Sequence, residues 1–216
     1  MYSTSYPPSL SRTFVSFLLC AALVVFCYFL VDPAFAFWAD RENLRRFVGF
    51  EYATHLVDVI IWLSVLYYVF FACTYARNTA MRRPLLDIAN SVTIAVFLKD
   101  ALKYVFGRYW PATWVNQNPS LLHDHAYGFH PFHAGVAYQS FPSGHTTVAL
   151  AAMTALWLGF PRWRWLAVLV SVLVVSGLLA EDYHFVGDCV AGAWLGATVA
   201  RYVTAHSRVR RAQAHL

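Results

Sequence analysis

The sequence predicts an all-α fold, an integral membrane bundle of about six transmembrane helices. Of the 216 residues, 59% are hydrophobic and only 12% are charged, and the mean hydropathy is +0.49. Apolar stretches of about twenty residues, long enough to cross a bilayer as helices, recur along the chain. The basic residues fall mostly in short segments between these stretches, so the net charge of +5 reflects membrane topology and does not indicate nucleic acid binding.

The expected spans follow one another within a single domain, residues 1–216, whose polar motifs lie between residues 99 and 192. We expect them at residues 14–31, 56–76, 86–106, 146–160, 165–180 and 186–202, with cytoplasmic tails at 1–13 and 204–216. The first two are the most apolar. The third is less apolar because it carries Lys99, Asp100 and Lys103, and the last three are short or have a polar residue at one end.

Two segments near the N-terminus have alternative interpretations. Arg12, the apolar run and Ala34-Phe35-Ala36 resemble a secretory signal with its cleavage site, but the run exceeds the usual length of about 7–15 residues. We therefore expect a retained membrane anchor. Residues 39–54 combine mixed charges with apolar residues at helical spacing, which fits either an amphipathic helix at the outer interface or a short folded loop.

The distribution of arginines predicts the orientation of the bundle. With the N-terminus inside, the cytoplasmic segments hold nine arginines: Arg12, Arg77, Arg82, Arg83, Arg162, Arg164, Arg208, Arg210 and Arg211. The outer segments then hold four: Arg41, Arg45, Arg46 and Arg108. This excess predicts that both termini are inside and that the 107–141 loop faces outward. We expect the inner membrane of a bacterium, with this loop on the periplasmic or exterior side.

Two short polar clusters at the outer ends of expected spans are the candidate functional residues. Burying polar, titratable groups beside apolar segments is costly unless they carry out chemistry. Ser143, Gly144 and His145 open one apolar helix, whose first N–H groups form an anion site, although Ser143 can also simply cap that helix. His184 and Asp188 are spaced i and i+4, so the carboxylate can hold the imidazole.

Cations at the end of the third span complete this candidate site. Lys99 and Lys103 are four residues apart and share a helix face. Lys103 and Arg108 can converge on one anion, and the planar guanidinium suits bidentate phosphate binding. Lys99 lies one turn deeper, where it either joins the site or pairs with Asp100.

These residues together resemble the type-2 phosphatidic acid phosphatase superfamily, membrane lipid phosphatases related to acid phosphatases and vanadium haloperoxidases. The family pattern is Lys, six residues, Arg-Pro; then Pro-Ser-Gly-His; then Ser-Arg, five residues, His, three residues, Asp. Residues 142–145 match the second part in full, and Lys103, Pro111, His184 and Asp188 match the others. The resemblance implies six spans, and the arginine distribution places the active site at the outer face.

The chain departs from this pattern at two arginines. Trp110 replaces the arginine of the first part, and Gly177-Leu178 replaces the Ser-Arg of the third. Glu181 and Asp182, just before the second histidine, add negative charge that repels an anion. Three explanations stay open: another arginine or a basic headgroup restores the charge, a divalent cation accompanies the substrate, or the activity is reduced or redirected.

The resemblance implies a lipid-phosphate phosphatase that uses no cofactor and no resident metal. His184 would attack phosphorus, Asp188 would orient it, and His145 would protonate the leaving group. The phosphate oxygens would be held by four residues: Lys103, Arg108, Ser143 and Gly144. The expected partners are a lipid phosphate substrate and the bilayer. Two alternatives are a lipid phosphotransferase and a non-catalytic phospholipid-binding or transport protein.

The outer loop also holds four histidines, His123, His125, His130 and His133, among several aromatic residues. Four histidines within eleven residues can bind a metal, but no acidic or cysteine partner shows diagnostic spacing. We therefore expect them to contact solvent or lipid headgroups. The tryptophans of the same loop suit a lid at the membrane interface.

Overall fold

The computed structural model describes residues 8–74, 82–114 and 117–213, and this part of the chain is helical apart from turns and one long loop. The α-helices are α1 Leu10–Phe26, α2 Asp32–Arg41, α3 Val48–Cys73, α4 Arg82–Phe106, α5 Leu121–Asp124, α6 Gly144–Gly159, α7 Arg164–Ala180 and α8 Val186–Gln213. A π-helical turn, Cys27–Val31, joins α1 to α2, and 3-10 turns occur at Leu44–Arg46, Val136–Tyr138 and Pro161–Trp163.

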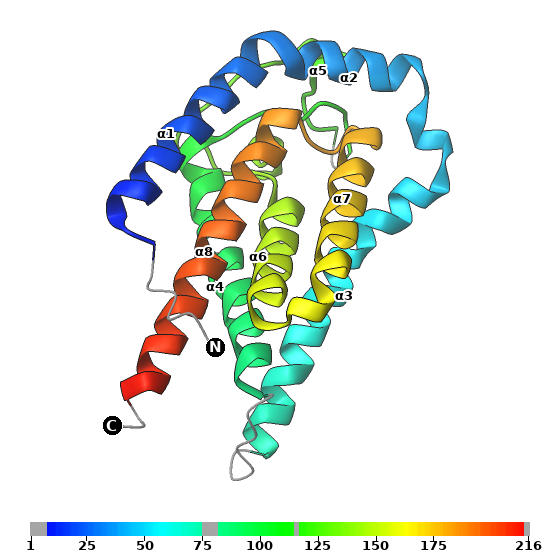
Figure 1. Cartoon of the computed structure of the whole chain (residues 1–216). Helices are drawn as coiled ribbons and strands as arrows, with labels where there is room; N and C mark the ends of the chain where they lie inside the picture. The colour runs from blue at the N-terminus through cyan, green and yellow to red at the C-terminus, as the bar shows by residue number, and fades with distance from the viewer. Residues whose placement is uncertain (1–7, 75–81, 115–116, 214–216) are drawn as a thin grey trace.

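Helix α6 is the centre of the bundle, in contact with α3, α4, α7 and α8 (Figure 1). Ser143 caps its N-terminus, where the side-chain oxygen accepts a hydrogen bond from the Thr146 N–H. Its buried positions are mostly small residues, four of them alanines. Small side chains let the neighbouring helices approach closely, which packs the polar first turn of α6 against them.

Two glycines of α8 bring its backbone against α6. A Cβ at Gly192 would lie 2.7 Å from the carbonyl oxygen of Ser143, and one at Gly196 would lie 2.8 Å from the Ala151 nitrogen. Such a GxxxG spacing is typical of close helix packing in membranes. The approach joins the two polar clusters, because the Ser143 N–H donates to the Asp188 carbonyl oxygen at 3.1 Å.

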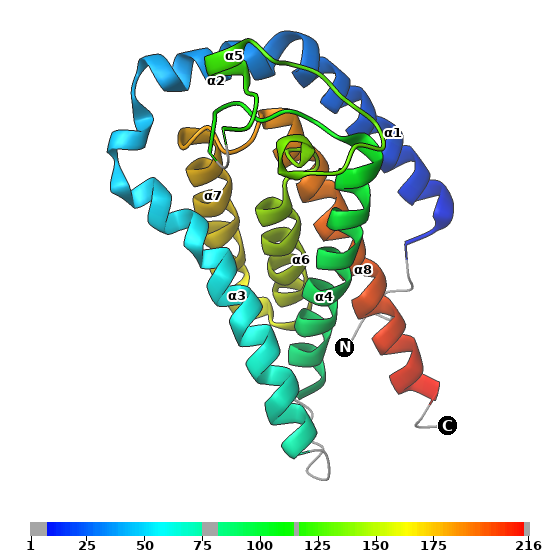
Figure 2. The same cartoon turned by 180° about the vertical axis from the view of Figure 1, so that it is seen from behind.

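The N-terminal helices form an arch around the bundle. Helix α1 runs along α8, and α2 then crosses the end of the bundle at which α6 and α8 begin (Figures 1 and 2). The change of direction occurs at the π-helical turn Cys27–Val31 and at Pro33 in the first turn of α2. Both are recognised causes of helix kinks.

Every expected span overlaps a helix of the structure. Residues 39–54 form neither a separate amphipathic helix nor a loop, because they contain the end of α2, a 3-10 turn and the start of α3. Helix α8 extends beyond the expected end at residue 202, to Gln213. The first and last residues of the expected tails, 1–7 and 214–216, lie outside the described residues.

Among the residues that the structure describes, three helical runs are long and apolar enough to cross a membrane: Leu10–Arg41, Val48–Cys73 and Pro161–Ala180. Helix α6 has only 16 residues, fewer than a helix needs to span the hydrocarbon core. The structure therefore supports a multi-helix membrane protein, and the total of six spans stays a prediction.

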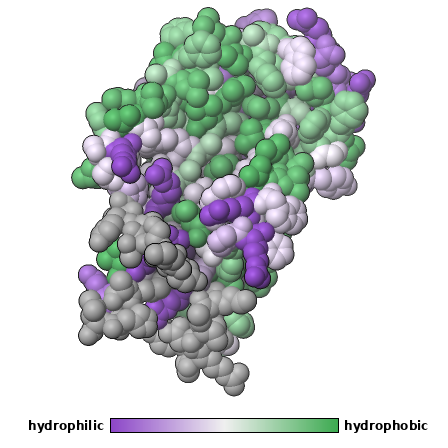
Figure 3. Space-filling model, viewed as in Figure 1, coloured by the Kyte–Doolittle hydropathy of each residue, from purple (hydrophilic) through white to green (hydrophobic). Residues whose placement is uncertain are grey.

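The outer surface of the bundle is strongly apolar. Helices α1, α3 and α7 expose many large hydrophobic side chains, among them Leu19, Trp62 and Trp165. Figure 3 shows apolar side chains covering much of one face, with polar side chains near the turn between α2 and α3. Exposed apolar area on this scale is typical of a surface in contact with lipid.

Of the arginines used to predict orientation, Arg77 lies outside the described residues.

Candidate active site

The candidate site lies at the end of the bundle where α4 and α7 finish and α6 and α8 begin (Figure 2). The loop after α4 folds over this end. Isolated backbone bridges hold the loop together: Arg108 with Phe129, Arg108 with Gln139, and Trp110 with Ser120.

Gly107 directs the chain from α4 into the site. Its φ of +50° is in the left-handed region, and its N–H donates to the Lys103 carbonyl at 2.9 Å. A Cβ at this position would lie against the carbonyl oxygen of His130. Because that oxygen belongs to the backbone, only glycine fits, and the next residue, Arg108, enters the interior.

His184 lies in the turn between α7 and α8, with only 3% of its surface exposed. Its Nδ1 atom is 3.6 Å from Asp188 Oδ2 and 3.5 Å from Ser140 Oγ. Burial lowers the pKa of His184 below its ordinary value, although Asp188 opposes this shift. The imidazole is therefore neutral near pH 7, and with a proton on Nδ1 the Nε2 atom keeps a lone pair for nucleophilic attack.

Asp188 is fully buried in the first turn of α8 and is fixed by several donors. Ser140 Oγ donates to Oδ2 at 2.6 Å, and the Phe185 N–H donates to the same oxygen at 3.0 Å. Arg108 Nη1 donates to Oδ1 at 2.5 Å. These bonds hold the carboxylate beside His184, although that histidine lies in the turn before α8, which begins at Val186, where the sequence predicts the last span to start.

Arg108 has partners other than the phosphate oxygens that the sequence predicts for it. The residue is fully buried, and Nη2 donates to Asp32 Oδ2 at 2.8 Å and to the Tyr127 hydroxyl at 2.9 Å. Four aromatic rings surround the guanidinium: Tyr28, Tyr127, Phe129 and Phe185. Three of its Nη hydrogen bonds thus go to two carboxylates and a phenol within the protein, whereas the buried Nε atom has no hydrogen-bond partner among the described residues.

Lys103, unlike Arg108, lies beside the rings of Trp110 and His184, where it can bind a phosphate. Its Nζ atom is 5.6 Å from the centre of the Trp110 ring, which in turn lies 5.2 Å from the His184 ring. Trp110, at the family's arginine position, therefore provides an aromatic face beside Lys103 where an arginine would supply charge. Lys103 also lines a cavity of about 200 Å³. Lys99 pairs with Asp100 at 2.6 Å, one of the two roles that the sequence allows.

The Pro-Ser-Gly-His cluster lies where the sequence predicts, at the N-terminus of α6. A Cβ at Gly144 would lie 3.5 Å from Lys103 Nζ, so the start of this helix and the lysine face each other. The buried Ser143 hydroxyl donates to Thr146 Oγ1 at 3.0 Å and acts as the helix cap, and its phosphate role stays a prediction. His145 is the second residue of α6 and is half-buried.

The geometry and the sequence agree with one protein family. The family model described as the PAP2 superfamily matches residues 84–211, more than half of the chain. The chain belongs to the PAP2 superfamily. All the predicted site residues lie within the matched region.

Curated relatives of this PAP2 protein are named for phosphatase activity. It is 30% identical to a lipid A 1-phosphatase of Rhizobium etli over 108 residues, which are 50% of this chain and 43% of the relative. It is 31% identical to the lipid A 1-phosphatase of Rhizobium johnstonii, and that alignment covers 50% of this chain and 41% of the relative. It is 29% identical to an undecaprenyl-diphosphatase of Sulfolobus acidocaldarius, covering 53% of this chain and 50% of the relative. The alignments span half or less of each relative's length. No solved structure matches the chain.

The acidic pair of this PAP2 protein is partly neutralised. Asp182 is buried, and its Oδ2 atom accepts a hydrogen bond from Arg45 Nη2 at 3.2 Å. Arg45 also lies over the Trp114 ring, at 4.7 Å, and that ring stacks on Tyr183 at 4.1 Å. Burial raises the pKa of Asp182 to about 7, which the arginine only partly opposes. Burial likewise raises the pKa of Glu181. Both shifts reduce the repulsion of an anion that the sequence predicts.

The loop histidines do not form one cluster in the structure. His123, His125 and His133 are exposed, and His130 lies among Tyr109, Tyr138 and His133. Within residues 8–74, 82–114 and 117–213, no three His, Cys, Asp or Glu side chains are grouped to hold a metal ion. Contact with solvent or headgroups therefore stays the expectation for these histidines.

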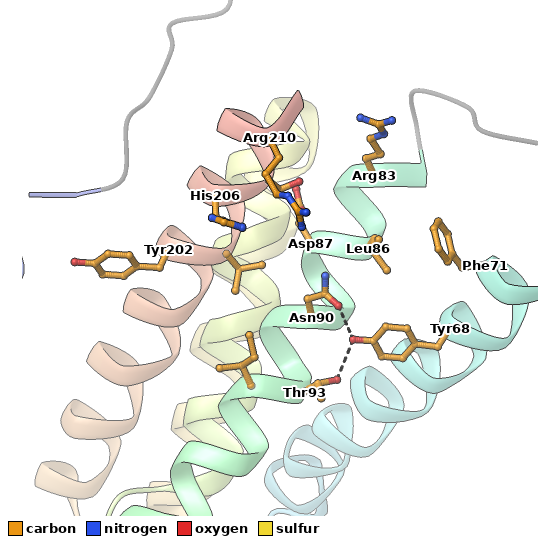
Figure 4. Close-up of a pocket in the computed structure, with 13 residues that line it drawn as sticks. Tyr68, Phe71, Arg83, Leu86, Asp87, Asn90, Thr93, Tyr202, His206 and Arg210 are labelled. Carbon is orange, nitrogen blue, oxygen red and sulfur yellow. Dashed lines mark hydrogen bonds between the residues drawn. The ribbon is translucent and has the colours of Figure 1, made fainter. Parts of the chain in front are cut away.

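A larger cavity, of about 1070 Å³, lies away from the predicted catalytic residues. It opens between α3, α4 and α8, near the start of α4 and the end of α8 (Figure 4). The Tyr68 hydroxyl forms hydrogen bonds with Asn90 and Thr93 on its wall. Its size does not make it the active site, because it lacks both histidines and the lysine that the family pattern requires.

Three residues of the site were not predicted from the sequence: Ser140, Asp32 and Tyr127. Ser140 immediately precedes the Phe-Pro-Ser-Gly-His run, and only its position gave a signal. Asp32 gave a stronger signal, because it is an ionisable residue directly after the apolar stretch 14–31, and ionisable residues at membrane depth usually have a function.

Proposed function

We propose that this PAP2 protein is a phosphoric ester hydrolase that releases phosphate from a phosphorylated membrane lipid. The observation that carries the proposal is the burial of His184 beside Asp188, at the end of the bundle where Lys103 faces the start of α6. A neutral, oriented imidazole next to a cation and a helix N-terminus suits phosphoryl transfer. The names of the curated relatives support the same class of substrate.

In this mechanism His184 is the nucleophile. Its Nδ1 side faces Asp188 and Ser140, which leaves Nε2 to attack phosphorus. The bond from phosphorus to the lipid oxygen breaks, and His145 donates a proton to that oxygen. Water then attacks phosphorus and gives a proton to His145, the bond from phosphorus to Nε2 breaks, and inorganic phosphate leaves, which restores the neutral His184 imidazole and the protonated His145.

Charge on the transferring phosphoryl group is stabilised by Lys103 and by the first N–H groups of α6, including that of Gly144. Helix N-termini carry a partial positive charge, and the lysine adds a full one. The site end of the bundle faces the periplasm or exterior in this proposal, since the arginine excess lies in the segments at the other end. The lipid chains would enter sideways between helices.

The test is phosphate release by purified protein from a panel of lipid phosphates: phosphatidic acid, phosphatidylglycerophosphate, undecaprenyl diphosphate and lipid A. We expect release from at least one of them, with and without a chelator, and at least a thousandfold loss in His184→Ala, because the nucleophile is gone. His123→Ala changes an exposed loop histidine and should keep full activity.

Each of four outcomes would contradict the proposal or a part of it. Full turnover by His184→Ala would exclude the phosphohistidine, and phosphate on a second lipid rather than in solution would indicate a phosphotransferase. Binding of lipid phosphates without release or transfer would identify a non-catalytic protein. Loss of all activity with chelator would show that a divalent cation takes part.

A further inference from the structure

Asp32 brings a carboxylate from the N-terminal arch into the candidate site. It is the first residue of α2, it lies outside residues 84–211 of the family match, and only 1% of its surface is exposed. Its Oδ2 atom accepts a hydrogen bond from Arg108 at 2.8 Å, and its Oδ1 atom accepts one from the Gly187 N–H at 2.9 Å. An aspartate in this position links two distant segments of the chain.

Local structure fixes this carboxylate. The π-helical turn Cys27–Val31 ends immediately before Asp32, so the arch bends where the aspartate must face the bundle. The turn also stacks Tyr28 on Tyr127 at 4.7 Å, and the Tyr28 carbonyl accepts a hydrogen bond from the Tyr127 hydroxyl at 2.6 Å. A Cβ at Gly187 would lie 3.0 Å from Asp32 Oδ2, so the residue before Asp188 leaves room for the carboxylate.

The resulting chain of contacts runs from Asp32 through Arg108 to Asp188, and Asp188 lies beside His184. All four residues are at most 3% exposed, and the guanidinium lies between two carboxylates. In such a dry site each charge depends on its partner, because water cannot replace a lost ion pair. A change at Asp32 is therefore transmitted to Asp188 through Arg108.

We propose that Asp32 is a positioning residue for phosphoryl transfer by this site. It holds Arg108 so that Nη1 binds Asp188 Oδ1, which leaves Oδ2 to face Ser140 and His184. Arg108 is then also a positioning residue and not a phosphate ligand. The inference rests on the proposed function and adds to it a contribution from the N-terminal arch.

The first test is Asp32→Asn, which keeps the size of the side chain and removes its charge. With the panel lipid that the wild-type protein hydrolyses fastest, we expect kcat to fall about 10- to 100-fold, as when outer partners of an active-site group are removed. KM and the inhibition constant of inorganic phosphate should change less than about twofold, because Lys103 and α6 still bind the phosphoryl group. A merely structural role would lower the amount of folded enzyme without this split.

The second test is a double-mutant cycle with Arg108→Gln. If both residues act through Asp188, the double variant should lose no more than the worse single variant, whereas independent effects would multiply. A rise in KM and in the phosphate inhibition constant of Arg108→Gln, with kcat unchanged, would show that Arg108 binds phosphate and would overturn the inference.

Asp40→Asn is the matched control, an exposed aspartate on the same helix that should keep wild-type kcat. If Asp32→Asn does not fold, as judged by its melting temperature and gel filtration, Tyr127→Phe replaces it, since this variant removes a milder partner of Arg108. The same selective fall in kcat is expected, at smaller size. If a folded Asp32→Asn or Tyr127→Phe variant has the same kcat as the wild-type protein, the positioning role is excluded and the proposed function still holds. If the wild-type protein itself is inactive, the proposed function is excluded.

Discussion

Asp188 is the residue on which the hydrogen bonds of the candidate site converge. Side chains from the long loop, Arg108 and Ser140, donate to its two oxygens, and the Phe185 N–H adds a third bond. A buried carboxylate with this many donors is held in one orientation. The neighbouring imidazole faces this carboxylate, with its Nδ1 3.6 Å from Asp188 Oδ2 and 3.5 Å from Ser140 Oγ.

At the residue scale, the state of His184 predicts the acid side of the pH profile. Burial lowers the pKa of His184, so the reactive neutral form persists below the ordinary histidine value of about 6.5. We expect kcat to fall only as the pH drops through this lowered pKa, because protonation removes the attacking lone pair. The measurement is kcat against pH from 4 to 9, at about the same saturating substrate level.

Asp188→Asn provides the check on this interpretation. Asp188 raises the pKa of His184, so its removal should move the acid limb to still lower pH while kcat falls. An acid limb in the wild-type protein centred at pH 7 or above would show that the imidazole is not desolvated as the structure indicates.

At the element scale, the contact between α6 and α8 determines whether the site assembles. Gly192 and Gly196 let the two backbones meet, which places the first turn of α8 beside the Pro-Ser-Gly-His turn. These glycines lie a few residues after Asp188, so one helix supplies both the carboxylate and the packing surface that positions it.

Gly196→Ala tests this packing. The added Cβ would meet backbone atoms of Thr147 and Ala151, which cannot rotate away, so we expect a loss of about 1–3 kcal/mol in stability. Thermal unfolding in detergent should show a lower melting temperature. Gly49→Ala is the control, because a Cβ there has nothing within 4 Å, and its stability should be unchanged or higher. Equal melting temperatures for the two variants would contradict the close contact.

At the scale of the whole molecule, the site end is closed by contacts between segments far apart in the sequence. Arg45, in the turn before α3, binds Asp182, in the turn before α8. Asp32 joins the arch to the loop and to α8. The opposite end carries the cavity of about 1070 Å³, whose walls come from α3, α4 and α8. These contacts at the site end therefore hold the N-terminal helices α1 and α2 against the rest of the bundle.

The Asp182 contact makes overall stability depend on pH. Burial raises the pKa of Asp182 to about 7, above its value in the unfolded chain. In the folded protein this carboxyl group therefore stays protonated up to a higher pH than in the unfolded chain. This contribution is complete below about pH 4 and is lost as the pH rises to about 7, with a total on the order of a few kcal/mol. Melting temperatures in detergent between pH 4 and 8 should fall accordingly.

Asp182→Asn is the matched variant for this effect. It keeps the shape of the side chain but cannot ionise, so the decline between pH 4 and 7 should be smaller than in the wild-type protein. A wild-type melting temperature that rises over this interval would mean that the ion pair with Arg45 outweighs the cost of burial.

The sequence by itself determined the family, the helical class and the approximate positions of the main helices, because these depend on local composition and on fixed spacing. Residues 142–145 and the pair His184 and Asp188 could be recognised for the same reason. The boundaries near residues 39–54 were not predicted well, since a turn between two helices there has no distinctive local signal.

Only the tertiary structure decided what Arg108 contacts. Sequence spacing predicts that Arg108 lies near Lys103 and binds phosphate, and that phosphate role stays a prediction. Its hydrogen-bond partners Asp32 and Asp188, which lie 76 residues before and 80 residues after it, were not predicted. Long-range pairs of this kind depend on how the arch crosses the bundle, which no local pattern records. The role of a buried charge follows from the partners that the fold brings to it, because in a dry interior a charge must be paired.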